Sequence, residues 1–429
     1  MKKILALMIA AMLLISLAAV PAFADEPSYK GRSITVTFES SENNDAYQAE
    51  IDAFCAKYGC DVDVEILSAD AKEANNTLFL RAATGNLPDI LKMSVGSLAN
   101  NLDPENNIQD LSGYPFIDNL VDGFKDAASG ANGQIWAVPT NTANVAGVFY
   151  NKEVLKSLNI ELPKTWDEFI DTCLWIKENT DLEPISNPYD GGAGKQITYL
   201  ASYYYIRQEN ENFVDQYVAR EINLHDSTAL MDALNKIYQQ WELGIQNEDP
   251  LSTSLEDSAI AICEGKAAFV ICRTNIMSIV ETACPEQLND IGFFPLPGKD
   301  PDARGVAVWM PQGWYMSSDS QDPELALLFL EFMTTPEAVE AYCSQITPTG
   351  AFMLKGVDLP DTVSNAVIEA QEWASTSSTP VMEYYLPFKG ANLPNILAML
   401  GTGEITPEVA VEQIEADFEL NAIQNGYWS

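Results

Sequence analysis

The feature that most constrains the fold of this chain is a regular exchange between two hydrophobic periods. Residues 33–38 and 61–66 alternate apolar and polar side chains, which is the pattern of half-buried strands. A helical repeat that ends at Gly59 lies between them, and a second helical stretch, 75–84, leads into a further strand at 89–91. Strand, helix and strand in this order predict a parallel sheet with helices packed on its faces.

The rest of the chain repeats this logic and exceeds one domain. Residues 135–150 form an apolar stretch broken at Pro139, which we interpret as two strand pieces joined by a crossing segment. Residues 267–271 and 291–294 are further short strands, and the chain beyond Pro336 has a mostly helical pattern. With 429 residues, 47% of them hydrophobic, the chain can fill two cores. We therefore expect an α/β protein with two lobes.

The N-terminus has the pattern of a secretory signal peptide. Residues 1–24 combine a basic start, an uncharged apolar run and small side chains at positions 22 and 24, with Asp25 as the first mature residue. The alternative is a membrane anchor, but the run is short for a span and no later stretch reaches about 18 apolar residues. No cysteine precedes Cys55, so we expect an exported protein that is not lipid-anchored through its own cysteine.

The net charge argues against two classes of partner. It is −39 over the whole chain, and removal of Lys2 and Lys3 with the signal peptide makes it −41. A charge of this sign repels phosphate backbones and anionic lipid surfaces. We therefore expect no nucleic-acid partner.

Catalytic and metal-binding signatures are scarce. His225 is the only histidine, which excludes most histidine-based triads and multi-histidine metal sites. Residues 191–195 read GGAGK but lack the spacing of a phosphate-binding loop, so we interpret them as a surface turn. The seven cysteines include no CxxC pair; Cys55 and Cys60 form either a local disulfide or two buried thiols. We expect no cofactor, no metal and no catalytic residues.

Six short motifs, in this order, resemble those of the family 1 extracellular solute-binding proteins of ABC importers, whose typical members carry sugars. The matching stretches are GNLPDI at 85–90, GQIWAVP at 133–139, YNK at 150–152, PKTWDE at 163–168, EGKAA at 264–268 and FPLPG at 294–298. Each is weak alone, and each has a structural interpretation of its own. Thr165 and Glu168, for example, form a capping box in which Trp166 is a packing residue.

The resemblance implies a two-lobed periplasmic-binding-protein fold of the class II type, in which each lobe is a mostly parallel sheet flanked by helices. The first lobe would comprise residues 25–142 and 296–336, and the second 143–295 and 337–429, with crossing segments at 140–144 and 294–297 acting as a hinge. It also implies a monomer that passes a small-molecule ligand, a carbohydrate, to the membrane permease subunits of an ABC transporter in the periplasm or at the outer face of the cell envelope.

Ligand contacts are expected from residues that follow the predicted strands, because ligands of open α/β sheets bind beyond the carboxyl ends of strands. The stretch 309–314, WMPQGW, adds rings and an amide that suit a sugar. The predicted ligand-binding residues are Glu39, Glu42, Met93, Ser94, Thr140, Asn141, Arg273, Asn275, Trp309, Gln312 and Trp314. The alternative for the two tryptophans is core packing.

One departure from the family pattern bears on the ligand. Where the family often has G-x-W, this chain has CRTN at 272–275, and the arginine indicates a charged or unusual sugar. The main alternative function is a secreted carbohydrate-active enzyme, for which we find no committed acid and base. A cell-surface adhesin would require all-β repeats, which the pattern lacks.

Overall fold

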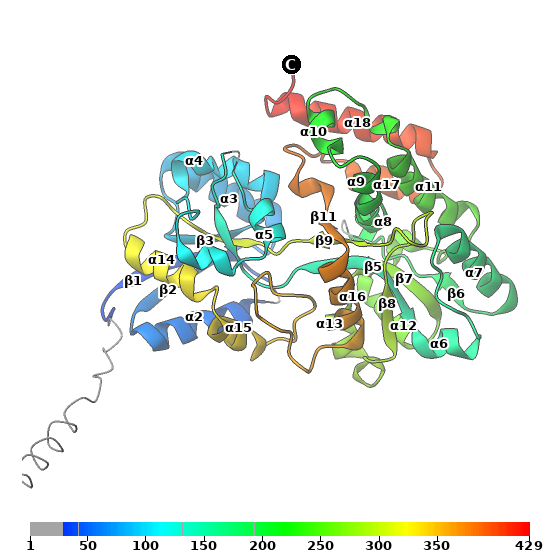
Figure 1. The fold of residues 1–429 in the computed structure, drawn as a ribbon, viewed down its shortest axis with the longest axis horizontal. Helices are drawn as coiled ribbons and strands as arrows, with labels where there is room; N and C mark the ends of the chain where they lie inside the picture. The colour runs from blue at the N-terminus through cyan, green and yellow to red at the C-terminus, as the bar shows by residue number, and fades with distance from the viewer. Residues whose placement is uncertain (1–28, 42, 131, 192–193) are drawn as a thin grey trace, which may run out of the picture.

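The computed structural model describes residues 29–41, 43–130, 132–191 and 194–429. The predicted signal peptide, 1–24, and Glu42 lie outside these residues. In the described part, two sheets lie side by side, each with its own helices, and form two lobes (Figure 1). The predicted two-lobed α/β architecture is confirmed.

The first lobe contains a five-stranded sheet in the order β2-β1-β3-β10-β4. Its strands are β1 (Ser33–Glu39), β2 (Asp61–Leu67), β3 (Ile90–Met93), β4 (Ala137–Pro139) and β10 (Gly313–Met316). Its helices are α2 (Asn44–Tyr58), α3 (Ala71–Thr84), α4 (Pro104–Asn107), α5 (Asp122–Ala127), α14 (Pro323–Phe332) and α15 (Pro336–Cys343).

The second lobe contains a six-stranded sheet in the order β11-β9-β5-β7-β6, with β8 also paired to β5. Its strands are β5 (Asn144–Asn151), β6 (Glu183–Ile185), β7 (Ala267–Arg273), β8 (Ile291–Phe294), β9 (Val306–Trp309) and β11 (Ser378–Pro380). Its helices are α6 (Lys152–Ser157), α7 (Trp166–Asn179), α8 (Ile197–Ala201), α9 (Tyr203–Glu209), α10 (Phe213–Val218), α11 (Thr228–Glu242), α12 (Leu255–Cys263), α13 (Ile276–Ala283), α16 (Asn365–Thr376), α17 (Leu393–Gly401) and α18 (Pro407–Gln424).

Both sheets are mixed, where the sequence pattern predicts mostly parallel ones. In the first sheet β1 is parallel to β2 and β3, but β10 is antiparallel to β3 and β4. In the second, β5 is antiparallel to β7, β8 and β9. The strands β5 and β10 each follow a crossing from the other lobe, so they enter their sheets against the direction of most of their neighbours.

The chain crosses between the lobes three times. Residues 140–143 connect β4 to β5, residues 310–312 connect β9 back to β10, and residues 344–364 lead from α15 to α16. The second crossing, predicted at 294–297, is therefore elsewhere: β8 and β9, on either side of this proline-rich stretch, both pair with β5. The lobe boundaries shift accordingly, because β9 lies in the second sheet and α15 packs on α2 in the first lobe.

Asp89 belongs to the motif GNLPDI at residues 85–90 and holds three segments of the first lobe together. Its carboxylate accepts hydrogen bonds from the backbone N–H and hydroxyl of Thr35, both at 2.8 Å, from the hydroxyl of Ser320 at 2.6 Å and from the N–H of Gln321 at 2.7 Å. Burial alone would raise the pKa of Asp89, but these hydrogen bonds lower it below its usual value. The motif is thus structural.

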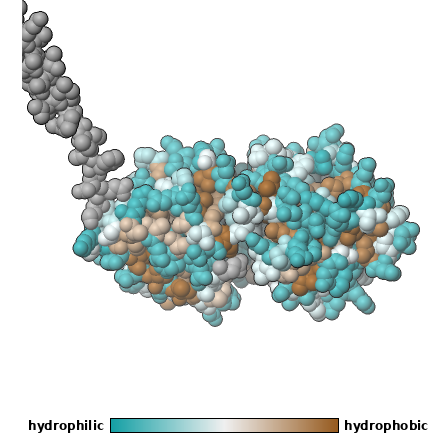
Figure 2. All heavy atoms as spheres, turned by 90° about the horizontal axis from the view of Figure 1, so that it is seen from below, coloured by the Kyte–Doolittle hydropathy of each residue, from teal (hydrophilic) through white to brown (hydrophobic). Residues whose placement is uncertain are grey.

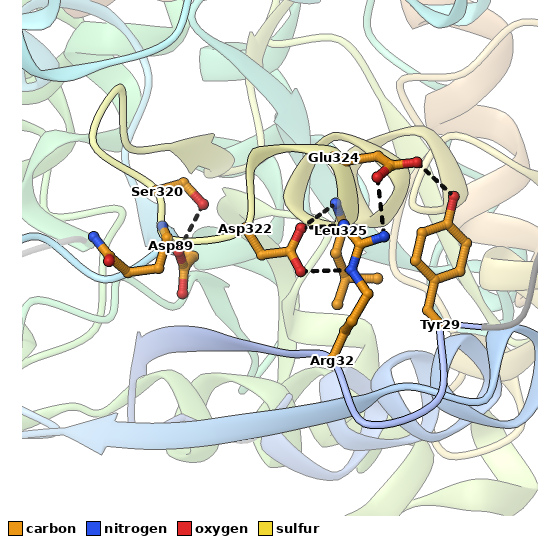
Figure 3. A network of polar contacts seen from close by, with 8 residues as sticks. Tyr29, Arg32, Asp89, Ser320, Asp322, Glu324 and Leu325 are labelled. Carbon is orange, nitrogen blue, oxygen red and sulfur yellow. Dashed lines mark hydrogen bonds and ion pairs between the residues drawn. The ribbon is translucent and has the colours of Figure 1, made fainter.

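A neighbouring network closes the start of β1 against the start of α14 (Figure 3). The guanidinium of Arg32 donates to the Asp322 carboxylate at 2.5 and 2.7 Å and to Glu324 at 2.9 Å. The hydroxyl of Tyr29 also donates to Glu324, at 3.3 Å. Asp322 additionally caps α14 by accepting the N–H of Leu325, so one carboxylate both starts a helix and fixes a strand.

The cysteines are free thiols. Cys55 and Cys60 are neighbours across the end of α2, where the N–H of Gly59 donates to the carbonyl of Cys55 at 2.8 Å in a left-handed cap. Burial, together with the neighbouring thiol of Cys60, raises the pKa of Cys55 to about 12. Of the two alternatives for this pair, the structure has two free thiols, of which Cys60 is buried and Cys55 is half-buried.

Lys236 of α11 is a buried cation in the second lobe. Its ammonium donates to the carbonyl of Pro297 at 2.7 Å and lies 5.4 Å from the ring centroid of Trp166 and 4.8 Å from that of Tyr205. Burial lowers the pKa of Lys236 to about 7. This lysine therefore ties the proline-rich stretch to the tryptophan of the capping box, and both motifs serve packing within one lobe.

Lys236→Met is expected to change how stability depends on pH. Because the folded pKa of Lys236, about 7, lies below the ordinary lysine pKa of 10.5, the unfolded chain binds more protons than the folded chain between these two pH values. The Lys236 contribution to the free energy of unfolding therefore rises with pH through this window, on the order of 1 kcal/mol per pH unit. Urea unfolding between about pH 7 and 8.5 should show the stability of the variant, relative to the native protein, falling as pH rises.

Lys177→Met is the matched control for this measurement, because the ammonium of Lys177 also donates to a carbonyl, that of Leu243 at 2.7 Å, but from an exposed position. Its difference from the native protein should stay constant with pH. An equally constant difference for Lys236→Met would contradict the prediction.

Candidate functional site

A cleft lies between the lobes, which Figure 2 shows as two masses in contact, with a mainly hydrophilic surface. Its largest part, the wide hollow, has a volume of about 810 Å³ and is lined by both lobes and by two of the crossing segments. The first lobe contributes Asn43 and Tyr342, and the crossings contribute Asn141 and Thr347. The second lobe contributes Asn144, Glu256, Asn275 and Glu281. The lining is rich in amides, hydroxyls and carboxylates.

A smaller hollow continues the cleft into the second lobe at the carboxyl end of β7. It has a volume of about 150 Å³, and its lining includes Leu255, Arg273 and Asn275 together with Pro188, Asp190, Gly191 and Gly194. Leu255 and Asn275 also line the wide hollow, so the two spaces adjoin. This is where ligands of α/β sheets are expected, beyond the carboxyl ends of neighbouring strands.

A third space, the outer hollow, has a volume of about 600 Å³ and lies between the loop after β3 and the C-terminal segment. Here the lobes touch: the hydroxyl of Ser97 donates to the carbonyl of Glu383 at 3.3 Å. Gly96 has a φ of +80°, and a Cβ at this position would lie 3.0 Å from the Tyr384 ring. Glycine is therefore required both by its backbone conformation and by the close approach of the other lobe.

The predicted residues Glu39, Thr140 and Asn141 gather around one tyrosine at the base of the first lobe. The ammonium of Lys92 lies 3.0 Å from the Glu39 carboxylate and 4.6 Å from the ring centroid of Tyr47. The amide of Asn141 donates to the Tyr47 hydroxyl at 3.1 Å. Burial raises the pKa of Tyr47, so the phenol stays protonated. Glu39 is committed to Lys92, whereas Asn141 also lines the wide hollow.

Arg273 and Trp309 form one unit on the second lobe. The guanidinium carbon of Arg273 lies 5.5 Å from the ring centroid of Trp309, within the range of a cation–π contact. Both residues end strands that pair with β5, which brings them together although they are distant in sequence. Trp309 is largely buried, with 8% of its surface exposed. Its ring is a support for the guanidinium.

Two predicted contacts are core residues. Met93 and Trp314 are each 0% exposed. The Trp314 ring packs edge-on against Phe38, Tyr47 and Phe329, with centroid distances of 5.9, 5.5 and 6.0 Å. For Trp314 the core-packing alternative therefore holds, and neither side chain reaches the cleft.

The remaining predicted residues have mixed positions. Ser94 lines the outer hollow, and its carbonyl accepts the Tyr315 hydroxyl at 3.1 Å. Gln312 is half-buried in the second crossing, where its carbonyl accepts the N–H of Thr140 at 3.0 Å and so joins two crossing segments. Glu42 is outside the described residues.

Sequence reasoning missed the loop after β6, which forms one wall of the small hollow. The buried amide of Asn187 donates to the side-chain oxygens of Gln240 and Gln246, both at 2.9 Å, and its N–H donates to Asn247 at 2.8 Å. This fixes the following residues, Pro188 and Asp190, at the hollow. The strand β6 has only three residues, too few for a period-2 signal, so its loop could not be found from the pattern.

Across the described ranges, no helix combines the length and apolarity needed to cross a membrane. Within the same residues, no group of three or more His, Cys, Asp or Glu side chains is placed to hold a metal ion.

Comparison with known proteins gives consistent relatives. The multiple sugar-binding protein of Streptococcus mutans is 22% identical over 298 residues, which cover 65% of this chain and 66% of that protein, just under two thirds of its length. An uncharacterized ABC transporter extracellular-binding protein of Pyrococcus horikoshii is 21% identical over 297 residues, 67% of this chain and 66% of that protein.

Solved structures show the same fold. The binding protein MsmE of Bacillus subtilis, in an open conformation, has a TM-score of 0.76 at 16% identity and covers 92% of this chain and 98% of its own. The raffinose complex of the binding protein RafE has a TM-score of 0.71 at 19% identity, covering 91% and 99%. The family model described as bacterial extracellular solute-binding protein matches residues 39–340, more than half of the chain. The chain therefore belongs to the bacterial extracellular solute-binding protein family.

Proposed function

We propose that this chain is the substrate-binding component of an ABC importer, which captures a mono- or oligosaccharide between its lobes and delivers it unchanged to a membrane permease. The observation that carries the proposal is the cleft lined by both lobes and the crossing segments. Amides and carboxylates there match the hydroxyl groups of sugars. A relative named for binding multiple sugars and a structural neighbour in complex with raffinose support this class of ligand.

The proposed mechanism is hinge closure, the general behaviour of periplasmic binding proteins. We take the moving bodies to be residues 29–139 with 313–343 and residues 144–309 with 365–429, joined by the three crossings. A ligand that touches both lobes binds the closed form better and shifts the population toward it. The permease then distinguishes loaded from empty protein by shape.

The proposed ligand contacts are the predicted residues that line the hollows, with Trp309 and Gln312 in supporting positions. They are Ser94, Asn141, Arg273 and Asn275. For the whole protein we propose a monomer that begins at Asp25, is exported to the periplasm or the outer face of the cell envelope, and carries no lipid on a cysteine of its own.

The proposal is tested with the chain that begins at Asp25. A thermal-shift screen against a saccharide library, followed by calorimetry, is expected to find at least one sugar with micromolar or tighter affinity. Chromatography after long incubation should recover this sugar unchanged. Turnover that scales with the amount of protein would instead support the alternative, a secreted carbohydrate-active enzyme.

Asn275→Ala provides a site-specific check, because Asn275 lines both the wide and the small hollow. Loss of one or two hydrogen bonds to sugar hydroxyls should weaken binding about 10-fold. The matched control is Asn395→Ala, which removes an exposed amide on α17 that donates to the side chain of its neighbour Asn392 at 2.9 Å. Equal affinities for both variants would place the ligand elsewhere.

A further inference from the structure

Arg273 lines the cleft without an anionic partner: among the arginines of the described residues only Arg273 and Arg304 form no ion pair, and Arg304 lines none of the three hollows. Arg32, Arg81 and Arg220 each reach a carboxylate within 3 Å. In the part of the chain that the structure describes, the guanidinium of Arg273 forms no such ion pair and donates no hydrogen bond; it makes a cation–π contact with the Trp309 ring, whose centroid lies 5.5 Å from the guanidinium carbon. It does so in a chain with a net charge of −39, where acids are abundant.

The position of Arg273 makes this lack of a partner costly. Burial lowers the pKa of Arg273, and the nearby Tyr384 and Glu383 only partly offset this effect. Glu383 is not available to it, because its carboxylate is paired with Lys389. A partly desolvated cation with unused N–H donors is unfavourable in the empty protein, and an anion that binds there recovers this free energy.

The small hollow next to Arg273 has the size and the lining for one sugar residue. Its volume is about 150 Å³, and a cavity of roughly that size accommodates a six-membered ring. Asn275 offers an amide to hydroxyl groups, and Gly191 presents open backbone, since no atom of the described residues lies within 4 Å of where its Cβ would be. The Trp309 ring limits the orientations of the guanidinium plane, which preorganises its fork of donors for a planar carboxylate.

We propose that the cleft selects an acidic saccharide and that Arg273 binds the carboxylate of a uronic acid residue seated in the small hollow. This inference rests on the proposed function and names its ligand class. A singly charged carboxylate fits better than a phosphate ester, because Asp190 lines the same hollow and repels a second negative charge. Neutral sugars would leave the guanidinium without a counter-charge.

The test compares disaccharides that differ only in the carboxylate. Digalacturonate, diglucuronate and dimannuronate are each titrated by calorimetry beside the neutral disaccharide of the same linkage. For at least one pair, the native protein should bind the uronate about 10- to 100-fold more tightly, the range expected for a charge-assisted hydrogen-bonded pair. Arg273→Met should abolish this preference, and Arg273→Lys should retain part of it.

Arg304→Met is the matched control. Arg304 is also half-buried in the second lobe, and its guanidinium carbon lies 5.1 Å from the ring centroid of Trp373, but it lines none of the three hollows. It should keep the uronate preference. Melting temperatures of all variants establish that they are folded.

The contrary outcomes are distinct. If neutral disaccharides bind as well as uronates, or if Arg273→Met leaves the preference unchanged, the acidic-ligand inference is overturned while the proposed function stands. If galactose 6-phosphate binds more tightly than every uronate, the carboxylate assignment is overturned. If no saccharide of any kind binds, the proposed function itself fails.

Discussion

Trp314→Ala is expected to lower the free energy of unfolding by about 3–5 kcal/mol, the usual cost of removing a fully buried aromatic side chain. Trp314 is 0% exposed and lies at the centre of an aromatic cluster with Phe38, Tyr47 and Phe329. Truncation to alanine leaves a cavity between β10, α2 and α14 that this close-packed cluster can fill only in part. Chemical unfolding followed by circular dichroism measures the loss.

Trp309→Ala separates packing from support of the site. Its indole is 8% exposed and carries the Arg273 guanidinium on its ring, so we expect a smaller loss of stability than for Trp314→Ala, together with weaker ligand binding. Trp314→Ala should bind ligand normally at temperatures where it is folded. If Trp314→Ala unfolds like the native protein, its assignment to the core is wrong; if Trp309→Ala binds normally, the tryptophan has no part in the site.

Asp89→Ala is expected to lower the free energy of unfolding by about 3 kcal/mol or more, because it leaves several buried donors without an acceptor. The carboxylate of Asp89 receives the N–H groups of Thr35 and Gln321 and the hydroxyl of Ser320, so three chain segments lose their common anchor. Because its folded pKa is lowered, this contribution is fully present at neutral pH and is lost as pH falls below 3.8, the value for an unperturbed aspartate.

Asp70→Ala is the matched control for Asp89→Ala. Asp70 also accepts a backbone N–H, that of Glu73 at 2.9 Å, but as an exposed helix cap of α3. Its loss should cost about 1 kcal/mol. If urea unfolding gives the two variants equal stability, Asp89 contributes no more than an exposed helix cap, and the prediction is wrong.

Local patterns were sufficient to predict individual strands of the first lobe and a helix start in the second. The strand predicted at 33–38 is β1 (Ser33–Glu39), and the strand predicted at 61–66 is β2 (Asp61–Leu67). The capping box of Thr165 and Glu168 is present at the start of α7. Such features depend on residues within one turn or one strand, where period and cap chemistry act directly.

The errors arise where long-range geometry decides. Proline at 295 and 297 restricts the backbone and excludes regular strand pairing, but it does not specify which lobe the chain enters next. The crossing predicted at 294–297 therefore lies at 310–312 in the structure. Two predicted ligand contacts, Met93 and Trp314, are wrong because successive side chains in a strand point to opposite faces of the sheet. Both side chains lie on the core side of their strands, β3 and β10. Ser94, one residue beyond Met93, reaches the outer hollow.

The three crossings have a consequence for how the chain acquires its structure in time. Strand β10, at residues 313–316, lies between β3 and β4, so the first sheet stays split until more than 310 residues have been made. The second sheet likewise waits for β11 at residues 378–380. Pairings between such distant segments form slowly, because the entropy of closing a long loop is lost before the new contacts stabilise the chain. A chain shorter than about 310 residues therefore cannot complete its first sheet, and an incompletely folded polypeptide is the state that can be threaded through a narrow export channel.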